Sequence, residues 1–158
     1  MKSGNFFDFK LVALNEWATL PIEGLGNKSI LVVFLKEHTT VDLVENTTEN
    51  EEKEGKNQAN RAFLTRILKA VQVELATDTF HVECNEDGLN ALSLIEAKQT
   101  AKVLIFGIKP NFLGLNFHLP MYKNTDYKGV RYLYSERLSL VENEAAHKRA
   151  LWDALKAW

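Results

Sequence analysis

The sequence predicts an α/β fold: a three-layer α/β/α arrangement around a mainly parallel central sheet, in a single domain covering residues 1–158. Two observations lead to this prediction. Runs of consecutive apolar residues at 30–35 and within the segment 102–107 are typical of strands that are covered on both faces. Segments with helical spacing of apolar residues, at 60–73 and 88–99, alternate with the strands, and this alternation favours a parallel sheet.

The remaining elements are weaker signals of the same kind. Short strands are predicted at 80–83 and 129–134, and a loop or a short helical turn at 111–119. A final helix is expected to begin at Ser139, because Glu142 three residues later completes a capping box. Together these elements supply further strands and helices for the predicted layers.

Two segments stand apart from this pattern. Residues 1–20 are expected to form an arm or a short helix, with many large apolar residues between Phe6 and Trp17. They are either a core element, the usual role of an apolar stripe, or a docking surface. Residues 45–58 contain no apolar residue and many glutamates, so we expect a mobile acidic loop there.

Composition limits the possible functions. The chain has 158 residues and a formal net charge of −2, so a role with nucleic acid would need a local basic patch. Its single cysteine, Cys84, cannot form an intramolecular disulfide and fits a reducing cytoplasm. The apolar run at 30–35 is too short to cross a membrane, and the N-terminus lacks the pattern of a signal peptide. We therefore expect a cytoplasmic protein without membrane contact.

Residues with catalytic potential are sparse. Glu37 and His38 follow the predicted strand at 30–35 and could form a water-activating pair, although two exposed polar residues at a strand end are the plainer interpretation. The four histidines lack the spacing of a helical metal site, and Cys84 alone cannot hold an iron–sulfur cluster. We expect no catalytic residue, no bound metal and no cofactor.

Basic and aromatic residues gather toward the C-terminus. Such a mixture can bind single-stranded nucleic acid by charge and by stacking. It is equally typical of an ordinary strand with one buried face, so weak DNA contact and a purely structural role both stay open. The candidates for nucleic-acid contacts are Lys128, Arg131, Tyr134 and Arg137.

The C-terminal segment contains Lys148, Arg149, Trp152 and Leu155 in one helical stretch, and in this it resembles the end of a uracil-DNA-glycosylase domain. In that family a strand delivers a His-Pro-Ser loop, and a helix of the pattern Lys-Arg-x-x-Trp-x-x-Leu follows. The helix pattern is present here as Lys148, Arg149, Trp152 and Leu155. In place of the His-Pro-Ser loop stands the tripeptide that begins at Tyr134, Tyr-Ser-Glu. The resemblance therefore implies a glycosylase-like fold that lacks the catalytic loop of the glycosylases.

Leu11 and Leu14 have the spacing of the leucines in an arm pattern L-x-x-L-x-I-x-x-W, with Trp17 two residues before the position of its tryptophan, and the tail contains Arg149-Ala-Leu-Trp. In these features the chain resembles a non-catalytic branch of that superfamily, the psi subunit of bacterial DNA polymerase III. The resemblance implies a non-enzymatic protein–protein adaptor in DNA replication. Its arm would contact the clamp loader through Leu11, Leu14 and Trp17, and its body would bind a chi-like subunit.

Two alternatives stay open. One is a divergent DNA glycosylase acting on damaged bases, with Glu37 or Asp42 activating water and Arg137 binding phosphate. The family's first strand runs into a Gly-Glu-x-Pro-Gly-type loop, whereas residues 36–40 contain neither glycine nor proline. The other alternative is an unrelated small α/β domain.

Overall fold

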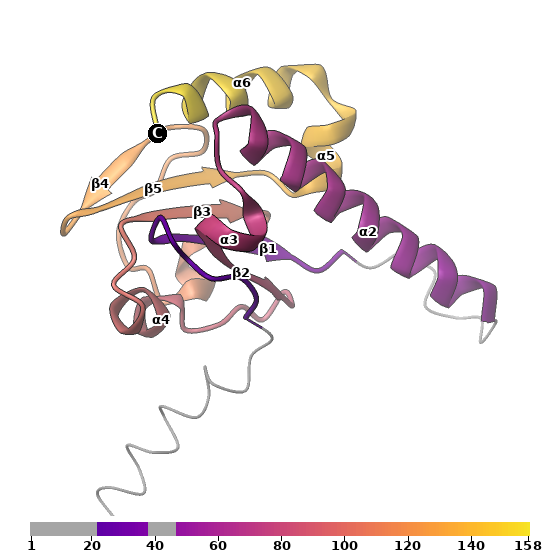
Figure 1. The fold of residues 1–158 in the computed structure, drawn as a ribbon, viewed down its shortest axis with the longest axis horizontal. Coiled ribbons are helices and arrows are strands. Elements are labelled where there is room, and N and C mark those ends of the chain that lie inside the picture. Colours follow the sequence, from indigo (N-terminus) through magenta and orange to yellow (C-terminus); the bar gives the residue numbers. More distant parts are fainter. Residues whose placement is uncertain (1–21, 38–46) are drawn as a thin grey trace, which may run out of the picture.

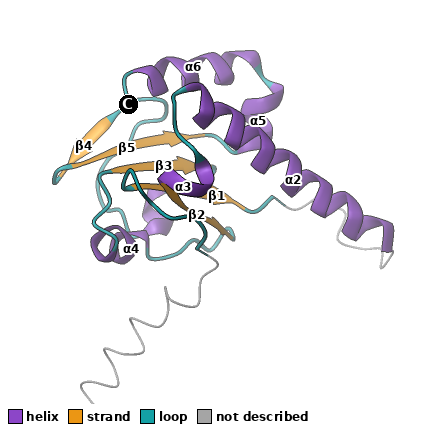
Figure 2. Ribbon diagram, viewed as in Figure 1, coloured by secondary structure: helices purple, strands orange, loops and turns teal. Residues whose placement is uncertain are grey.

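A computed structural model describes residues 22–37 and 47–158, with the backbone alone for residues 47–58. Helices and strands alternate along the chain, as Figures 1 and 2 show. In chain order the elements are β1 (Ile30–Leu35), α2 (Thr47–Ala70), α3 (Leu75–Asp78), β2 (Thr79–Cys84), α4 (Ala91–Ala97), β3 (Lys102–Phe106), η1 (Pro110–Leu113), β4 (Thr125–Tyr127), β5 (Val130–Ser135), α5 (Leu138–Asn143) and α6 (Ala145–Lys156).

The described strands form a five-stranded sheet in the order β2-β1-β3-β5-β4. Neighbouring strands are parallel except β4, which pairs antiparallel with β5 at the edge. Val32 of β1 lies between His81 of β2 and Leu104 of β3, and Leu104 pairs in turn with Leu133 of β5. This arrangement confirms the predicted α/β fold with a mainly parallel central sheet.

Helices cover both faces of the sheet (Figure 2). On one face Val32 belongs to an apolar cluster with Leu64 of α2 and Leu151 of α6. On the other face Val33 packs in a second cluster with Leu94 of α4. All five side chains are almost fully buried. The alternation of side chains along β1 thus feeds two cores, which explains why its sequence is apolar without interruption.

The structure corrects the prediction for residues 45–58. From Thr47 these residues form the first half of α2 rather than a loop. Figure 1 shows this half of the helix extending beyond the sheet. Glutamate, lysine and glutamine are good helix formers, so a polar segment continues a helix whose second half, from Phe63, packs on the core.

The C-terminal helix also differs from its prediction. It begins one residue earlier, as α5, and is interrupted by the extended backbone of Glu144 before α6 starts. Ser139 lies inside α5 instead of at its N-cap, so the predicted capping box with Glu142 is wrong. The N-cap residue, Arg137, makes no side-chain cap either. Ser139 instead donates hydrogen bonds to the carboxylate of Glu37, described below.

The other predicted elements are confirmed with shifted ends. The strand predicted at 80–83 is β2, the strand at 129–134 is β5, and the turn within 111–119 is η1, which starts one residue before it. The helix predicted at 88–99 is α4, capped by the Asn90 side chain. None of the helices in the described parts of the chain combines the length and the apolar character needed to cross a membrane.

Candidate functional site

The order of the strands creates a candidate site at the carboxyl ends of the parallel strands. From β1 the chain passes to β2 on one side, and it then returns to β3 on the other side. In parallel sheets, ligands commonly bind outside the carboxyl ends of strands where the order reverses in this way. Here this point lies between β1 and β3. Glu37 stands two residues beyond β1, and Gly107 directly follows β3.

Glu37 is fully engaged with neighbouring residues. Its carboxylate accepts hydrogen bonds from the Asn60 amide of α2 and from the Ser139 hydroxyl and backbone N–H of α5, the last at 3.2 Å. The Arg137 Nε atom lies 3.8 Å from a Glu37 oxygen. Only 10% of the Glu37 side chain is exposed, so the interpretation of this residue as an exposed strand-end group is wrong.

These contacts indicate that Glu37 stabilises the fold. A carboxylate at the first turn of a helix accepts hydrogen bonds from groups that lack partners within the helix, and its charge interacts favourably with the helix dipole. Glu37 does this for α5 and also satisfies Asn60, which is 6% exposed. Its side chain therefore joins the end of β1 to α2 and α5 and supplies the cap that was predicted to come from Ser139 itself.

The chain packs closely beside Glu37. Gly107 has a φ of +78°, and a Cβ atom added to it would lie 2.8 Å from the Arg137 Cβ and 3.2 Å from the Leu35 Cβ. The Gly107 N–H donates to the Ser135 carbonyl at 2.9 Å. The ends of β1 and β3 and the segment after β5 are thus in direct contact.

The Tyr-Ser-Glu segment that replaces the glycosylase loop is also engaged internally. Ser135 is completely buried, and its hydroxyl donates to the Glu136 carbonyl at 3.1 Å. The Glu136 N–H reaches the Tyr122 hydroxyl at 3.4 Å, and this hydroxyl lies 2.9 Å from His147 Nδ1. Burial raises the pKa of Tyr122, so its hydroxyl stays protonated around neutral pH.

The residues predicted to contact nucleic acid do not share one surface. Arg131 and Tyr134 project from opposite faces of β5, because their positions in the strand differ by an odd number. Arg131 is bound by both oxygens of Asp126, at 2.8 and 3.2 Å, and Arg137 lies against Glu37. Lys128 is in the turn between β4 and β5. Both arginines thus have carboxylate partners within the protein.

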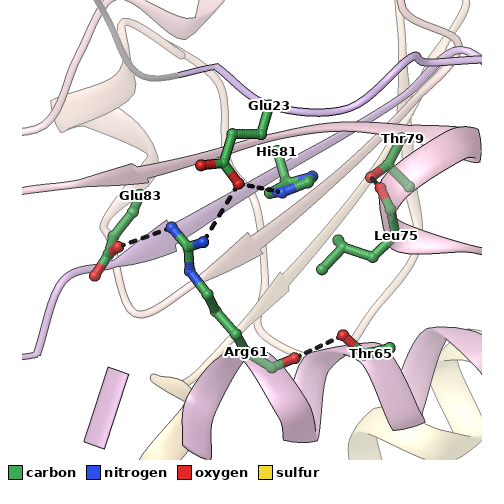
Figure 3. A network of polar contacts seen from close by, with 7 residues as sticks. All are labelled: Glu23, Arg61, Thr65, Leu75, Thr79, His81 and Glu83. Atoms are coloured by element: carbon green, nitrogen blue, oxygen red, sulfur yellow. Dashed lines mark hydrogen bonds and ion pairs between the residues drawn. The ribbon is translucent and has the colours of Figure 1, made fainter. Parts of the chain in front are cut away.

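A second polar network lies at the lateral edge of the sheet that β2 forms (Figure 3). A Glu23 carboxylate oxygen is 3.1 Å from His81 Nε2 and 3.3 Å from an Arg61 nitrogen. The other terminal nitrogen of Arg61 lies 3.5 Å from Glu83. No sequence pattern indicates this network, because its members come from three separate segments of the chain and none belongs to a recognisable motif.

The network fixes the segment at 22–29 to the edge of the sheet. Glu23 and His81 exchange two backbone hydrogen bonds, both of 2.9 Å. The N–H groups of Leu25 and Asn27 donate to carbonyls of α3, at 3.1 and 2.9 Å. This segment covers the unpaired edge of β2, which would otherwise be open to strand addition.

Replacing Arg61 with alanine is expected to loosen this segment. The loss of both ion pairs should cost only about 0.5–1 kcal/mol, because Arg61 is 42% exposed. Amide hydrogen exchange at 22–29, followed by mass spectrometry, should nevertheless become faster. Arg66→Ala removes an exposed ion pair from the same helix and serves as the control. Equal exchange at 22–29 in the two variants would contradict the anchoring role of Arg61.

The described region contains one further reactive group, the thiol of Cys84. Burial raises the pKa of Cys84 to about 12, so its thiol is neutral near pH 7 and a poor nucleophile. Within residues 22–37 and 59–158, histidine, cysteine and carboxylate side chains form no group of three that could hold a metal ion.

Several predicted residues lie outside the described parts of the chain. They are the arm residues Leu11, Leu14 and Trp17 and the candidate water-activating residues His38 and Asp42. Their roles stay predictions. Neither the family models nor the curated proteins with which the sequence was compared match this chain.

Proposed function

We propose that the protein is a non-enzymatic protein–protein adaptor with a uracil-DNA-glycosylase-like fold, resembling the psi subunit of bacterial DNA polymerase III. The observation that supports this proposal most strongly is the engagement of Glu37 by Asn60, Ser139 and Arg137. A carboxylate with these partners holds three elements together instead of facing a reacting group.

A glycosylase would need a different arrangement at this edge. It requires a carboxylate or an amide beside the extruded nucleotide, with an oxygen free to orient a water molecule. The Glu37 oxygens already accept hydrogen bonds from two residues, and Ser135, where the glycosylases have their loop, is buried. The contacts of Glu37 and of Ser135 therefore favour a role in stabilising the fold over a role in catalysis.

The proposed adaptor binds through two parts of the chain. The arm contributes Leu11, Leu14 and Trp17 to a clamp-loader interface, and the body binds a chi-like subunit. Large aromatic and aliphatic residues of this kind often supply most of the binding energy of an interface. The anchoring of 22–29 by Glu23 and Arg61 supports this proposal, because it attaches the arm at a defined place.

Trp17→Ala tests the docking role of the arm. If Trp17 contacts a partner, the change should weaken clamp-loader binding by about 2 kcal/mol or more and leave the melting temperature nearly unchanged. If Trp17 is instead a core residue, the change should destabilise the protein by roughly 3–5 kcal/mol. Thermal melting of the two proteins, together with a pull-down on purified clamp-loader subunits, separates these outcomes.

Incubation with a uracil-containing oligonucleotide tests the catalytic alternative. The adaptor proposal predicts no release of the base by the wild-type protein at any enzyme concentration. Base release that is lost in Glu37→Gln while the fold persists would contradict the proposal and favour the glycosylase.

A further inference from the structure

A groove of about 920 Å³ lies between the second half of α2 and the helices α5 and α6. These three helices cover the same face of the sheet (Figure 1). The groove has an apolar lining, and one of its aromatic residues, Trp152, is 38% exposed. The apolar residues are Phe63, Ile67, Ala70, Ala145, Leu151 and Trp152. An exposed apolar groove of this kind is a typical site for the side chains of a binding partner.

Positive charge surrounds this apolar surface. Arg66, Lys148 and Arg149 line the groove together with one carboxylate, that of Glu142, which lies 3.6 Å from Arg66. Arg149 forms no ion pair with any residue in the described parts of the chain. The groove therefore carries an excess of cations although the whole protein has a formal net charge of −2.

Two of these cations, Arg66 and Lys148, are held at the groove by contacts with an aromatic ring. The Arg66 guanidinium and the Lys148 ammonium lie 5.9 and 5.7 Å from the centre of the Phe63 ring. Phe63 itself is 6% exposed. These contacts hold the two cations at the groove. Arg66 also pairs with Glu142, whereas the Lys148 ammonium has no carboxylate partner in the described parts of the chain.

We propose that this groove binds an acidic segment of a partner protein, with an apolar side chain of that segment inserted beside Trp152. This inference rests on the proposed adaptor function and gives it a second docking surface. The apolar lining would bury the anchor, and Lys148 and Arg149 would pair with the flanking carboxylates. The charge of the groove is complementary to that of such a segment.

The same observations argue against two other possible occupants of the groove, single-stranded nucleic acid and a second copy of this chain. Single-stranded nucleic acid needs aromatic rings on which bases can stack, but Trp152 is the one aromatic residue of the groove with a large exposed surface. A second copy could offer the acidic residues at 47–58, but that stretch has no apolar residue to serve as an anchor.

Selection from a library of displayed short peptides on the immobilised full-length protein tests this proposal. The selected peptides should combine Asp or Glu with a large apolar residue. Their affinity, measured by fluorescence anisotropy, should fall about tenfold or more in the double variant Lys148→Glu, Arg149→Glu. Trp152→Ala should weaken the same peptides. Lys109→Glu, a charge reversal on an exposed residue far along the chain from the groove, is the matched control and should leave the affinity unchanged.

The groove proposal would be overturned if no peptide is selected, or if the selected peptides lack acidic residues. Equal binding by the groove variants and the control would overturn it too, and so would tighter binding of an oligothymidine than of the peptides. Self-association of the full chain that is lost in the double variant would assign the groove to a second copy instead. Failure of the groove leaves clamp-loader binding through the arm intact, whereas failure of the adaptor proposal appears as base release or as absent clamp-loader binding.

Discussion

Replacing Glu37 with alanine is expected to lower the free energy of unfolding by about 3 kcal/mol. The change leaves the buried Asn60 amide and the Ser139 N–H without their acceptor, and it removes the carboxylate next to Arg137. Urea denaturation followed by circular dichroism measures the loss. Since m reflects the surface exposed on unfolding, an unchanged m value would show that the effect is one of stability.

Two variants serve as references for this result. Glu37→Gln keeps one oxygen that can accept from the Ser139 N–H, so it should lose less stability than Glu37→Ala. Glu86→Ala removes a carboxylate from an exposed turn and should change the stability by less than about 0.5 kcal/mol. Wild-type stability in Glu37→Ala would mean that this carboxylate does not join the three elements.

Gly107→Ala is expected to destabilise the protein by roughly 2–3 kcal/mol. Part of this cost comes from the φ of +78°, which L-residues rarely adopt. The rest comes from the Arg137 and Leu35 atoms that a Cβ would meet at 2.8 and 3.2 Å. Chemical denaturation compares the variant with the wild type.

Gly129→Ala is a matched control for this substitution. Gly129 has nearly the same φ, +79°, but an added Cβ would meet no atom within 4 Å. This variant should therefore lose only the conformational part, about 1 kcal/mol. Equal losses in the two variants would contradict the close packing of β3 against the segment after β5.

The central sheet was predictable because its strands are apolar on both faces. The runs at 30–35 and 102–107 correspond to β1 and β3, the two strands at the centre of the parallel order. Their sequences alone indicate coverage by helices on both sides. The edge strand β4 was missed, since three mostly exposed residues carry no periodic signal.

Contacts between distant residues were beyond the reach of sequence patterns. Ser139 followed by Glu142 satisfies a local capping rule, yet Ser139 binds Glu37, which is 102 residues away. The pair of Glu23 and His81 is separated by 58 residues. The polar half of α2 was missed for a different reason. Its helix propensity is good, but it offers no apolar face, and that face was the signal used for helices.

Some residues of the groove and of the site at Glu37 were singled out in the sequence, but their roles could not be predicted from it. Lys148 and Arg149 were recognised as part of the Lys-Arg-x-x-Trp-x-x-Leu pattern of the final helix. Only the packing of α2 beside α6 places these cations around one groove. Glu37 was also singled out, but its environment, and not its residue type, decides between a catalytic and a structural role.

Titration of the purified clamp-loader complex into the full-length protein by isothermal calorimetry tests the proposed adaptor function most directly. The adaptor proposal predicts saturable binding that Trp17→Ala weakens while the variant keeps the wild-type melting temperature. The absence of any binding by the folded wild-type protein would contradict it.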